Sequence, residues 1–139
     1  MAIDGGLWPL IKAGLPNWDF QRIETGGTGR GIPDVNGCLL GNEIWVELKG
    51  TDGWKPIIRP EQVGWAERRT RAGGRVFLAV RRQCAAGPRR IVADELWVYR
   101  ADGFRTVATM GLKDNPPVLF YRDGPRNWDW AEIQELFLS

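Results

Sequence analysis

Three charged residues lie within a mostly apolar stretch of the chain, GIPDVNGCLLGNEIWVELKG, at positions 31–50. Glu47 and Lys49 are two positions apart in a run typical of a strand, so both side chains emerge on the same face and their apolar neighbours point to the other. Asp34 lies thirteen positions before Glu47 and opens the preceding strand. A hairpin between the two strands can therefore bring the two carboxylates together across the sheet.

Two carboxylates that share one site repel each other, and a buried carboxylate is costly unless another charge compensates it. A divalent cation removes both costs, and oxygen ligands without histidine or thiolate favour Mg²⁺ or Mn²⁺. A lysine beside such a cation can orient or deprotonate a water molecule, or stabilise the charge of a pentavalent phosphate. The alternative interpretation is purely structural: a Glu47–Lys49 salt bridge and an Asp34 that caps a turn.

The chain of 139 residues contains no histidine. This excludes Ser-His and Cys-His catalysis, histidine general bases and most zinc sites. The only cysteines, Cys38 and Cys84, match no zinc spacing, and we expect them to be reduced core thiols. Any chemistry must come from carboxylates, lysine, arginine, tyrosine or a hard metal ion.

The net charge of +2 is small, but its distribution is uneven. Residues 68–93 contain eight arginines and no acidic residue. Arginine is the side chain best suited to bidentate phosphate contacts, so this run is consistent with a nucleic-acid-binding surface. A solvated basic surface without a partner is the alternative.

The hydrophobic pattern predicts a mixed α/β fold in one domain, in which strands and helices follow each other along the chain. Pro60 fits the first position of a helix that ends before the Gly73–Gly74 pair, and Asn127 or Asp129 can cap a C-terminal helix. The expected helices are Leu7–Leu15, about 60–72 and about 128–138; the expected strands are Asp19–Thr25, Asp34–Leu40, Glu43–Lys49 after a Gly41–Asn42 turn, Arg75–Arg82, Leu96–Arg100 and Pro117–Arg122.

In these motifs the sequence resembles the PD-(D/E)xK nuclease superfamily. GIPDV matches its P-D element, VELKG matches its E-x-K element, and RPEQVGWAERRTRAGGRVFLAV resembles the glutamine helix and following strand of the VRR-NUC branch, which is similar to archaeal-type Holliday junction resolvases. The resemblance covers about residues 22–80. It implies a restriction-endonuclease-like fold, with a mixed central β-sheet flanked by helices.

The resemblance also implies a Mg²⁺-dependent (or Mn²⁺-dependent) endodeoxyribonuclease. Asp34, Glu47 and the backbone carbonyl of Leu48 would bind the metal, Lys49 would serve the attacking water, and Gln62 would reach the site from the following helix. Gln62 can equally be an ordinary exposed polar residue of that helix. Many relatives carry a further glutamate on the first helix, which this chain lacks; Asp4 or Glu24 would have to take its place.

Several residues near these motifs are candidates for contacts with DNA, and we select the following: Arg30 in the glycine-rich loop, Trp54, Lys55 and Arg59 after the E-x-K strand, and Arg68 and Arg69 on the glutamine helix. The expected core of motifs spans about residues 19–82. A tryptophan-rich extension follows at about 94–139, and it can serve as core, as a dimer interface or as a DNA-facing addition.

We therefore predict a metal-dependent DNA endonuclease that hydrolyses phosphodiester bonds in branched or structured DNA, as Holliday junction resolvases do. The alternatives are a non-catalytic DNA-binding protein on a nuclease fold and a protein-interaction module. One site per chain would need two chains to cut two strands, so we expect a homodimer. The chain has neither a long apolar run nor a secretory signal pattern, and we expect it in the cytoplasm, or in the host cytoplasm if it is viral.

Overall fold

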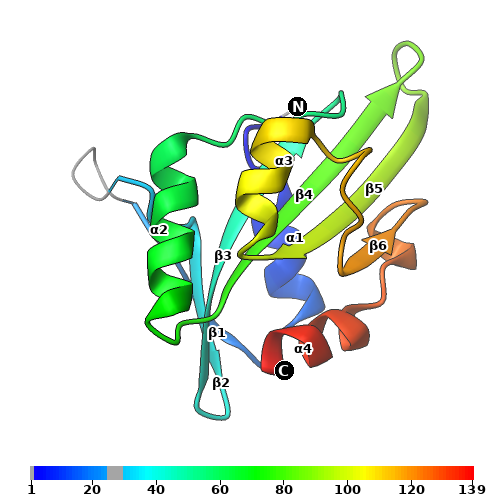
Figure 1. The fold of residues 1–139 in the computed structure, drawn as a ribbon. Coiled ribbons are helices and arrows are strands. Elements are labelled where there is room, and N and C mark those ends of the chain that lie inside the picture. The colour runs from blue at the N-terminus through cyan, green and yellow to red at the C-terminus, as the bar shows by residue number, and fades with distance from the viewer. Residues whose placement is uncertain (1, 25–29) are drawn as a thin grey trace.

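The computed structural model describes residues 2–24 and 30–139, and its elements form one mixed α/β fold with a six-stranded sheet (Figure 1). The elements are α1 (Leu7–Gly14), β1 (Asp19–Arg22), β2 (Val35–Leu39), β3 (Asn42–Thr51), α2 (Pro60–Arg71), β4 (Val76–Ala85), β5 (Ile91–Arg100), α3 (Gly103–Met110), β6 (Leu119–Tyr121), the 3₁₀ turn η1 (Pro125–Asn127) and α4 (Trp130–Leu138).

The strands lie in the sheet in the same order as in the chain, β1 to β6. Every neighbouring pair is antiparallel except β3 and β4, which are parallel. A parallel pair needs a crossover connection, and α2 supplies it. The first residues of α2 therefore lie near the end of β3, where Glu47 and Lys49 are placed.

The helices cover both faces of the sheet (Figure 1). On one face α1 and α4 bury residues such as Ile11 and Phe137 against Leu48 and Phe77. On the other face α2 and α3 pack with Leu78 and other sheet residues into a second core. Residues 76–80 of β4 are apolar on both faces, because each face is buried in one of the two cores.

Most of the elements predicted from the sequence are present, and α4 begins after Asp129, whose carboxylate accepts a hydrogen bond from the Glu132 amide. The predicted turn was wrong by one position: β2 and β3 are joined by Leu40 and Gly41, both with positive φ, as a two-residue hairpin turn requires. The predicted end of the first strand, Thr25, lies outside the described residues.

The C-terminal third was the least well predicted part of the fold. Helix α3 was missed, and β5 begins at Ile91, five residues before the predicted Leu96. Strands β5 and β6 extend the same sheet, and α4 belongs to the core on one of its faces. The prediction of core thiols was also wrong, because Cys38 and Cys84 are free but only half-buried.

Candidate metal-binding site

The hairpin of β2 and β3 positions the two carboxylates that the sequence singled out. Val35 pairs with Val46, so Asp34 and Glu47 stand next to each other at the point where the β2–β3 ladder ends. Glu47 and Lys49 lie on the face of β3 that α2 covers, whereas the side chain of Leu48 is buried in the opposite core. The predicted alternation of the strand is thus confirmed.

Gln62 joins this pair from the first turn of α2. Its Nε2 donates to Glu47 Oε2 at 2.9 Å, and its Oε1 accepts from Lys49 Nζ at 3.1 Å. Lys49 Nζ is also 3.2 Å from the same Glu47 oxygen. All three side chains are buried, so Gln62 is not an ordinary exposed helix residue.

The same oxygen of Gln62 also fixes the beginning of α2. Gln62 Oε1 accepts a hydrogen bond from the backbone N–H of Arg59, the N-cap residue, at 2.9 Å. A glutamine at the third helical position commonly makes this contact, which satisfies an amide that the helix itself leaves unpaired. One side chain therefore couples the start of α2 to Glu47 and Lys49.

The second oxygen of Glu47 has no hydrogen-bond partner among the described residues, although it is buried. Burial and, to a lesser extent, the neighbouring Asp34 carboxylate raise the pKa of Glu47 to about 7, although Lys49 opposes both effects. An orphaned carboxylate oxygen of this kind costs free energy unless another group binds it. Glu47 thus has one satisfied oxygen and one that is available to a ligand.

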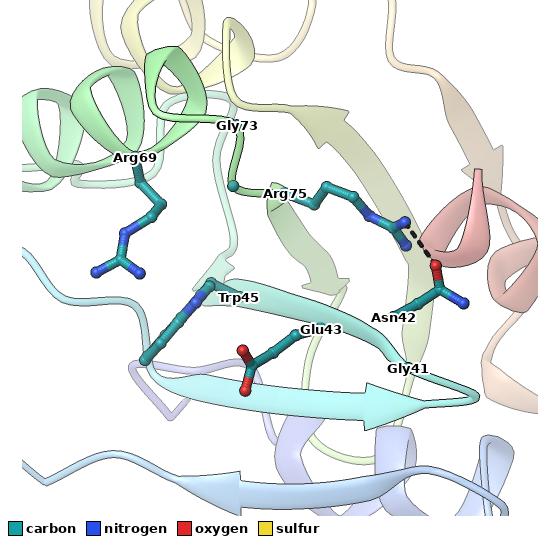
Figure 2. Close-up of a pocket in the computed structure, with 8 residues that line it drawn as sticks. Gly41, Asn42, Glu43, Trp45, Arg69, Gly73 and Arg75 are labelled. Atoms are coloured by element: carbon teal, nitrogen blue, oxygen red, sulfur yellow. Dashed lines mark hydrogen bonds between the residues drawn. The ribbon is translucent and has the colours of Figure 1, made fainter.

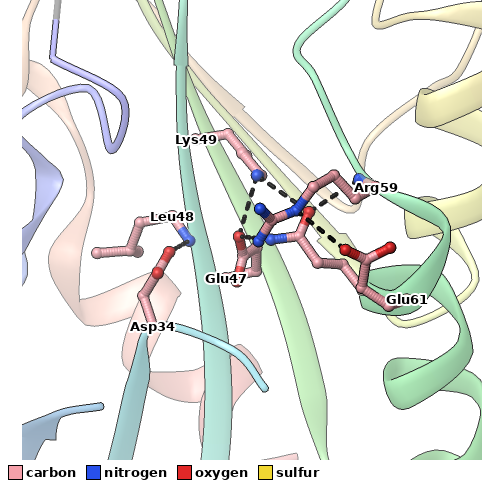
Figure 3. A network of polar contacts seen from close by, with 7 residues as sticks. Asp34, Glu47, Leu48, Lys49, Arg59 and Glu61 are labelled. Carbon is pink, nitrogen blue, oxygen red and sulfur yellow. Dashed lines mark hydrogen bonds and ion pairs between the residues drawn. The ribbon is translucent and has the colours of Figure 1, made fainter. Parts of the chain in front are cut away.

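Asp34 lies just before the start of β2 and is held beside β3 by the backbone of that strand (Figure 3). Its Oδ2 accepts a hydrogen bond from the backbone N–H of Leu48 at 2.9 Å. Burial raises the pKa of Asp34, and the Leu48 hydrogen bond together with the charges of Lys49 and Arg22 partly offsets that rise. Its carboxylate is thereby fixed in orientation, with one oxygen not used by the Leu48 amide.

The N-terminal segment closes one wall of the site because Gly50 has no side chain. The Gly50 amide donates to the Ile3 carbonyl at 2.7 Å, and a Cβ on Gly50 would lie 2.6 Å from the Ala2 carbonyl oxygen. This close approach brings Asp4 near enough to Asp34 to raise the pKa of that carboxyl. The Asp4 side chain accepts a hydrogen bond from the Gly6 amide, so part of it is already engaged.

These residues line a pocket of about 740 Å³. Sequence reasoning missed five of its lining residues: Ala2, Arg22 of β1, Gly50, and Ile3 and Ile57, which are both more than 80% exposed. No local motif marks them as site residues, since they reach the pocket only through the fold. Asp4, one of the two residues considered for the extra acidic ligand, lines the pocket, whereas Glu24, the other, does not.

The residues predicted to contact DNA are dispersed. Arg59 lines the pocket, and Arg30 is exposed but outside it. Trp54 is 41% exposed, but the Arg82 guanidinium stacks on its ring at 3.6 Å and Trp97 packs against it edge to face. Its neighbour Lys55 is exposed. The loop after β3 is therefore anchored to the sheet at Trp54.

Arg68 and Arg69 lie further along α2, away from the pocket. Arg69 stacks over Trp65 at 4.6 Å and over Trp45 at 5.4 Å. It borders a second pocket of about 310 Å³ at the C-terminal end of α2, where Figure 2 shows its guanidinium on the side of Trp45. Arg68 is exposed to solvent. Both arginines are about two helical turns from Gln62, roughly 10 Å along the axis.

The donor set at the main pocket suits a hard divalent cation. Asp34, Glu47 and Leu48 line it, and one buried oxygen of Glu47 lacks a partner among the described residues. Three or more acidic, cysteine or histidine side chains do not come together as a metal cluster anywhere in residues 2–24 and 30–139. A cation at this position would thus be held by two carboxylates, with carbonyl and water oxygens completing its shell, as is common for Mg²⁺.

Two further results bear on the function. Within the described residues, no helix combines the length and the apolar character that crossing a membrane would require. No protein-family model matches the chain, and comparison with curated proteins finds no match. The function is therefore inferred from the geometry of the site.

Proposed function

We propose that this protein is a metal-dependent DNA endonuclease, with a restriction-endonuclease-like fold and Mg²⁺ or Mn²⁺ as its cofactor. The observation that carries the proposal is the state of Glu47. One of its oxygens is bound by Lys49 and Gln62, while the other is buried without a partner next to a second carboxylate, Asp34. A purely structural salt bridge would not require this second, repelling carboxylate.

Asp34, Glu47 and the carbonyl of Leu48 are the residues that would hold the cation. When bound, the metal would supply a Lewis acid for a phosphate oxygen and lower the pKa of a water molecule. The protein's own contribution is position: the Leu48 amide fixes Asp34, and Gln62 fixes Glu47 and Lys49 relative to each other. Preorganised groups of this kind lose little free energy to reorganisation during the reaction.

Lys49 is the candidate for direct action on the attacking water or the charged phosphate. Its ammonium group donates to Gln62 and contacts Glu47, so it is directed toward the carboxylates and away from solvent. Arg22 and Arg59 line the same pocket and are suited to bind the phosphates on either side. The active site would thus combine two acidic metal ligands, the buried ammonium group of Lys49 and two arginines at the rim of the pocket.

A branched or otherwise structured DNA is the proposed substrate, on the resemblance to Holliday junction resolvases. Because each chain carries one such pocket, cutting both strands would require a homodimer. We place the activity in the cytoplasm, where the two free cysteines would stay reduced.

Nicking of supercoiled plasmid in the presence of Mg²⁺ tests the proposal. Asp34→Asn retains an acceptor for the Leu48 amide and removes the charge, and Lys49→Ala removes the ammonium group. Both variants should lose nicking while they bind DNA in Ca²⁺. Nicking that survives both changes would show that the site is wrong.

The same experiment separates the alternatives. Binding of DNA at low salt without cleavage of linear, flap or four-way-junction substrates would indicate a non-catalytic DNA-binding protein. Absence of binding at low salt would indicate a protein-interaction module.

A further inference from the structure

The hairpin formed by β4 and β5 extends beyond the end of β3, the neighbouring strand. The last residue pair between β3 and β4 is Thr51–Arg82, whereas β4 and β5 continue to pair as far as Ala85 and Ile91. Figure 1 shows the tip of this hairpin projecting beyond the rest of the sheet, at the end where β3 finishes and the N-terminal segment lies. The metal-site pocket is at the same end, because it is lined by residues 47–50 of β3 and residues 2–4.

The arginines of the hairpin fall into two groups. At the base, Arg81 pairs with Asp94 at 2.8 Å and Arg82 pairs with Glu95 at 3.1 Å. Their charges are therefore balanced within the hairpin. These two arginines are thus no longer candidates for the nucleic-acid-binding surface that the basic run of the sequence indicated. At the tip, Arg89 and Arg90 are exposed, and neither forms an ion pair with any described residue.

The tip itself is a closed turn with a defined conformation. The Ala86 amide donates to the Arg90 carbonyl at 2.9 Å, and the Arg90 amide donates to the Gly87 carbonyl at 3.3 Å. Arg89 has a left-handed backbone with a φ of 63°, which the short turn imposes. No acidic residue occurs between Gln83 and Ala93, so the tip is uniformly basic.

We propose that Arg89 and Arg90 form a phosphate clamp that holds a duplex arm of the DNA beside the metal-site pocket. Two exposed guanidinium groups without acidic neighbours match the phosphate backbone in charge and in hydrogen-bond geometry. The pocket and the tip lie at the same end of the sheet, so a single duplex can reach both. The position of the cleaved phosphate in this proposal rests on the proposed function, whereas the contact at the tip needs no cleavage.

The sheet register sets the reach of the clamp. Lys49 pairs with Val80, and the five residues from Val80 to Ala85 extend about 17 Å at about 3.3 Å per residue. With the turn added, the arginines lie within about 25 Å of Lys49. At about 3.4 Å per nucleotide, this backbone distance places the contacted phosphates about seven base pairs from the cleaved one.

Binding measurements by fluorescence anisotropy, with Ca²⁺ in place of Mg²⁺, test the clamp. The double variant Arg89→Ala/Arg90→Ala is compared with Arg122→Ala/Arg126→Ala, which removes the same charge from two other exposed arginines. Loss of two phosphate contacts should reduce the slope of the logarithm of the DNA association constant against the logarithm of the salt concentration by about 2. Affinity at 0.1 M salt should then fall between about tenfold and about sixtyfold.

A series of DNA arms locates the contact. Wild-type affinity should rise when the duplex arm is lengthened from four to eight base pairs and should change little from eight to twelve. The tip variant should show no such rise, and Arg89→Lys/Arg90→Lys should restore most of the salt slope. An unchanged urea midpoint of the tip variant checks that it is folded.

The clamp would be refuted if the tip variant kept the wild-type rise with arm length, or if the control pair lost as much affinity as the tip pair. Failure of the proposed function has a different signature. In that case the wild-type protein cuts no substrate in Mg²⁺, yet the effect of arm length and its loss in the tip variant persist.

Discussion

Glu47→Gln is expected to change the pH dependence of stability in the metal-free protein. In the unfolded chain the Glu47 carboxyl has its ordinary pKa of 4.5, and in the folded protein burial raises the pKa to about 7. Between these values the folded state binds more protons, so the free energy of unfolding decreases as the pH rises. The contribution is fully present below about pH 4.5 and is lost above about pH 7.

The separation between these two pKa values corresponds to about 3 kcal/mol. Glutamine occupies nearly the same volume, accepts a hydrogen bond as Glu47 does from Gln62, and does not titrate. The stability of the variant relative to the wild type should therefore increase by up to about 3 kcal/mol between pH 5 and pH 8. Comparing the two proteins cancels most contributions from groups that both retain.

Urea unfolding followed by tryptophan fluorescence in EDTA measures this difference. With an m value of about 2 kcal/mol per molar urea, the midpoints should diverge by more than about 1 M over the pH range. Glu135→Gln, which removes a charge from an exposed position on α4, controls for net charge. A difference that is constant or that shrinks with pH would refute the reasoning from burial. Added Mg²⁺ at pH 8 should stabilise the wild type and not Glu47→Gln.

Three further outcomes follow from the site. Lys49→Ala should reduce single-turnover nicking by about 100-fold or more with little change in DNA affinity, and an unchanged rate would exclude a direct role. Gln62→Ala leaves Glu47, Lys49 and the Arg59 amide short of a partner; urea unfolding should show a loss of about 1–3 kcal/mol. Gly50→Ala should lower the free energy of unfolding by about 1–3 kcal/mol and expose the N-terminal segment to proteases. Gly53→Ala should do neither, because the nearest atom to its added Cβ, Thr51 Oγ1, would be 3.9 Å away.

Local patterns sufficed where the determining interactions are close in sequence. The alternation around Glu47 gives its face directly, and Pro60 marks the start of α2 because its ring fits the first helical position. Asp129 likewise caps α4 through an amide three residues away. These features could be predicted because each depends on the chain within a few residues.

Helix α3 could not be predicted because its sequence, GFRTVATM, contains β-branched residues of modest helix propensity. It is stabilised by burial of Phe104 and Val107 in the core that includes Tyr99. The first half of β5 was missed for a related reason. Asp94 and Glu95 break its apolar pattern, and only the partner strand reveals that they pair with arginines.

The site depended on both kinds of information. Asp34, Glu47 and Lys49 were identified by spacing, since hairpin geometry brings such spacings together, whereas Gln62 was suggested only by the resemblance of its helix to that of a nuclease family. The proximity of Asp4 was left undecided because it depends on a contact between Gly50 and the N-terminal segment. The basic run could not be divided into paired and exposed arginines without the register of β4 on β5.

The agreement between chain order and sheet order has a consequence for synthesis on the ribosome. Strands can be added to the sheet one at a time as the polypeptide emerges, and all the residues that line the pocket are translated by residue 62. The opposite layer is completed last, because Phe137, one residue before the end of α4, packs on Phe77 and Trp18. A nascent chain that lacks α4 would thus expose the apolar face of the sheet while the residues of the pocket were already present. By covering this face, the nine-residue helix α4 protects the protein against aggregation.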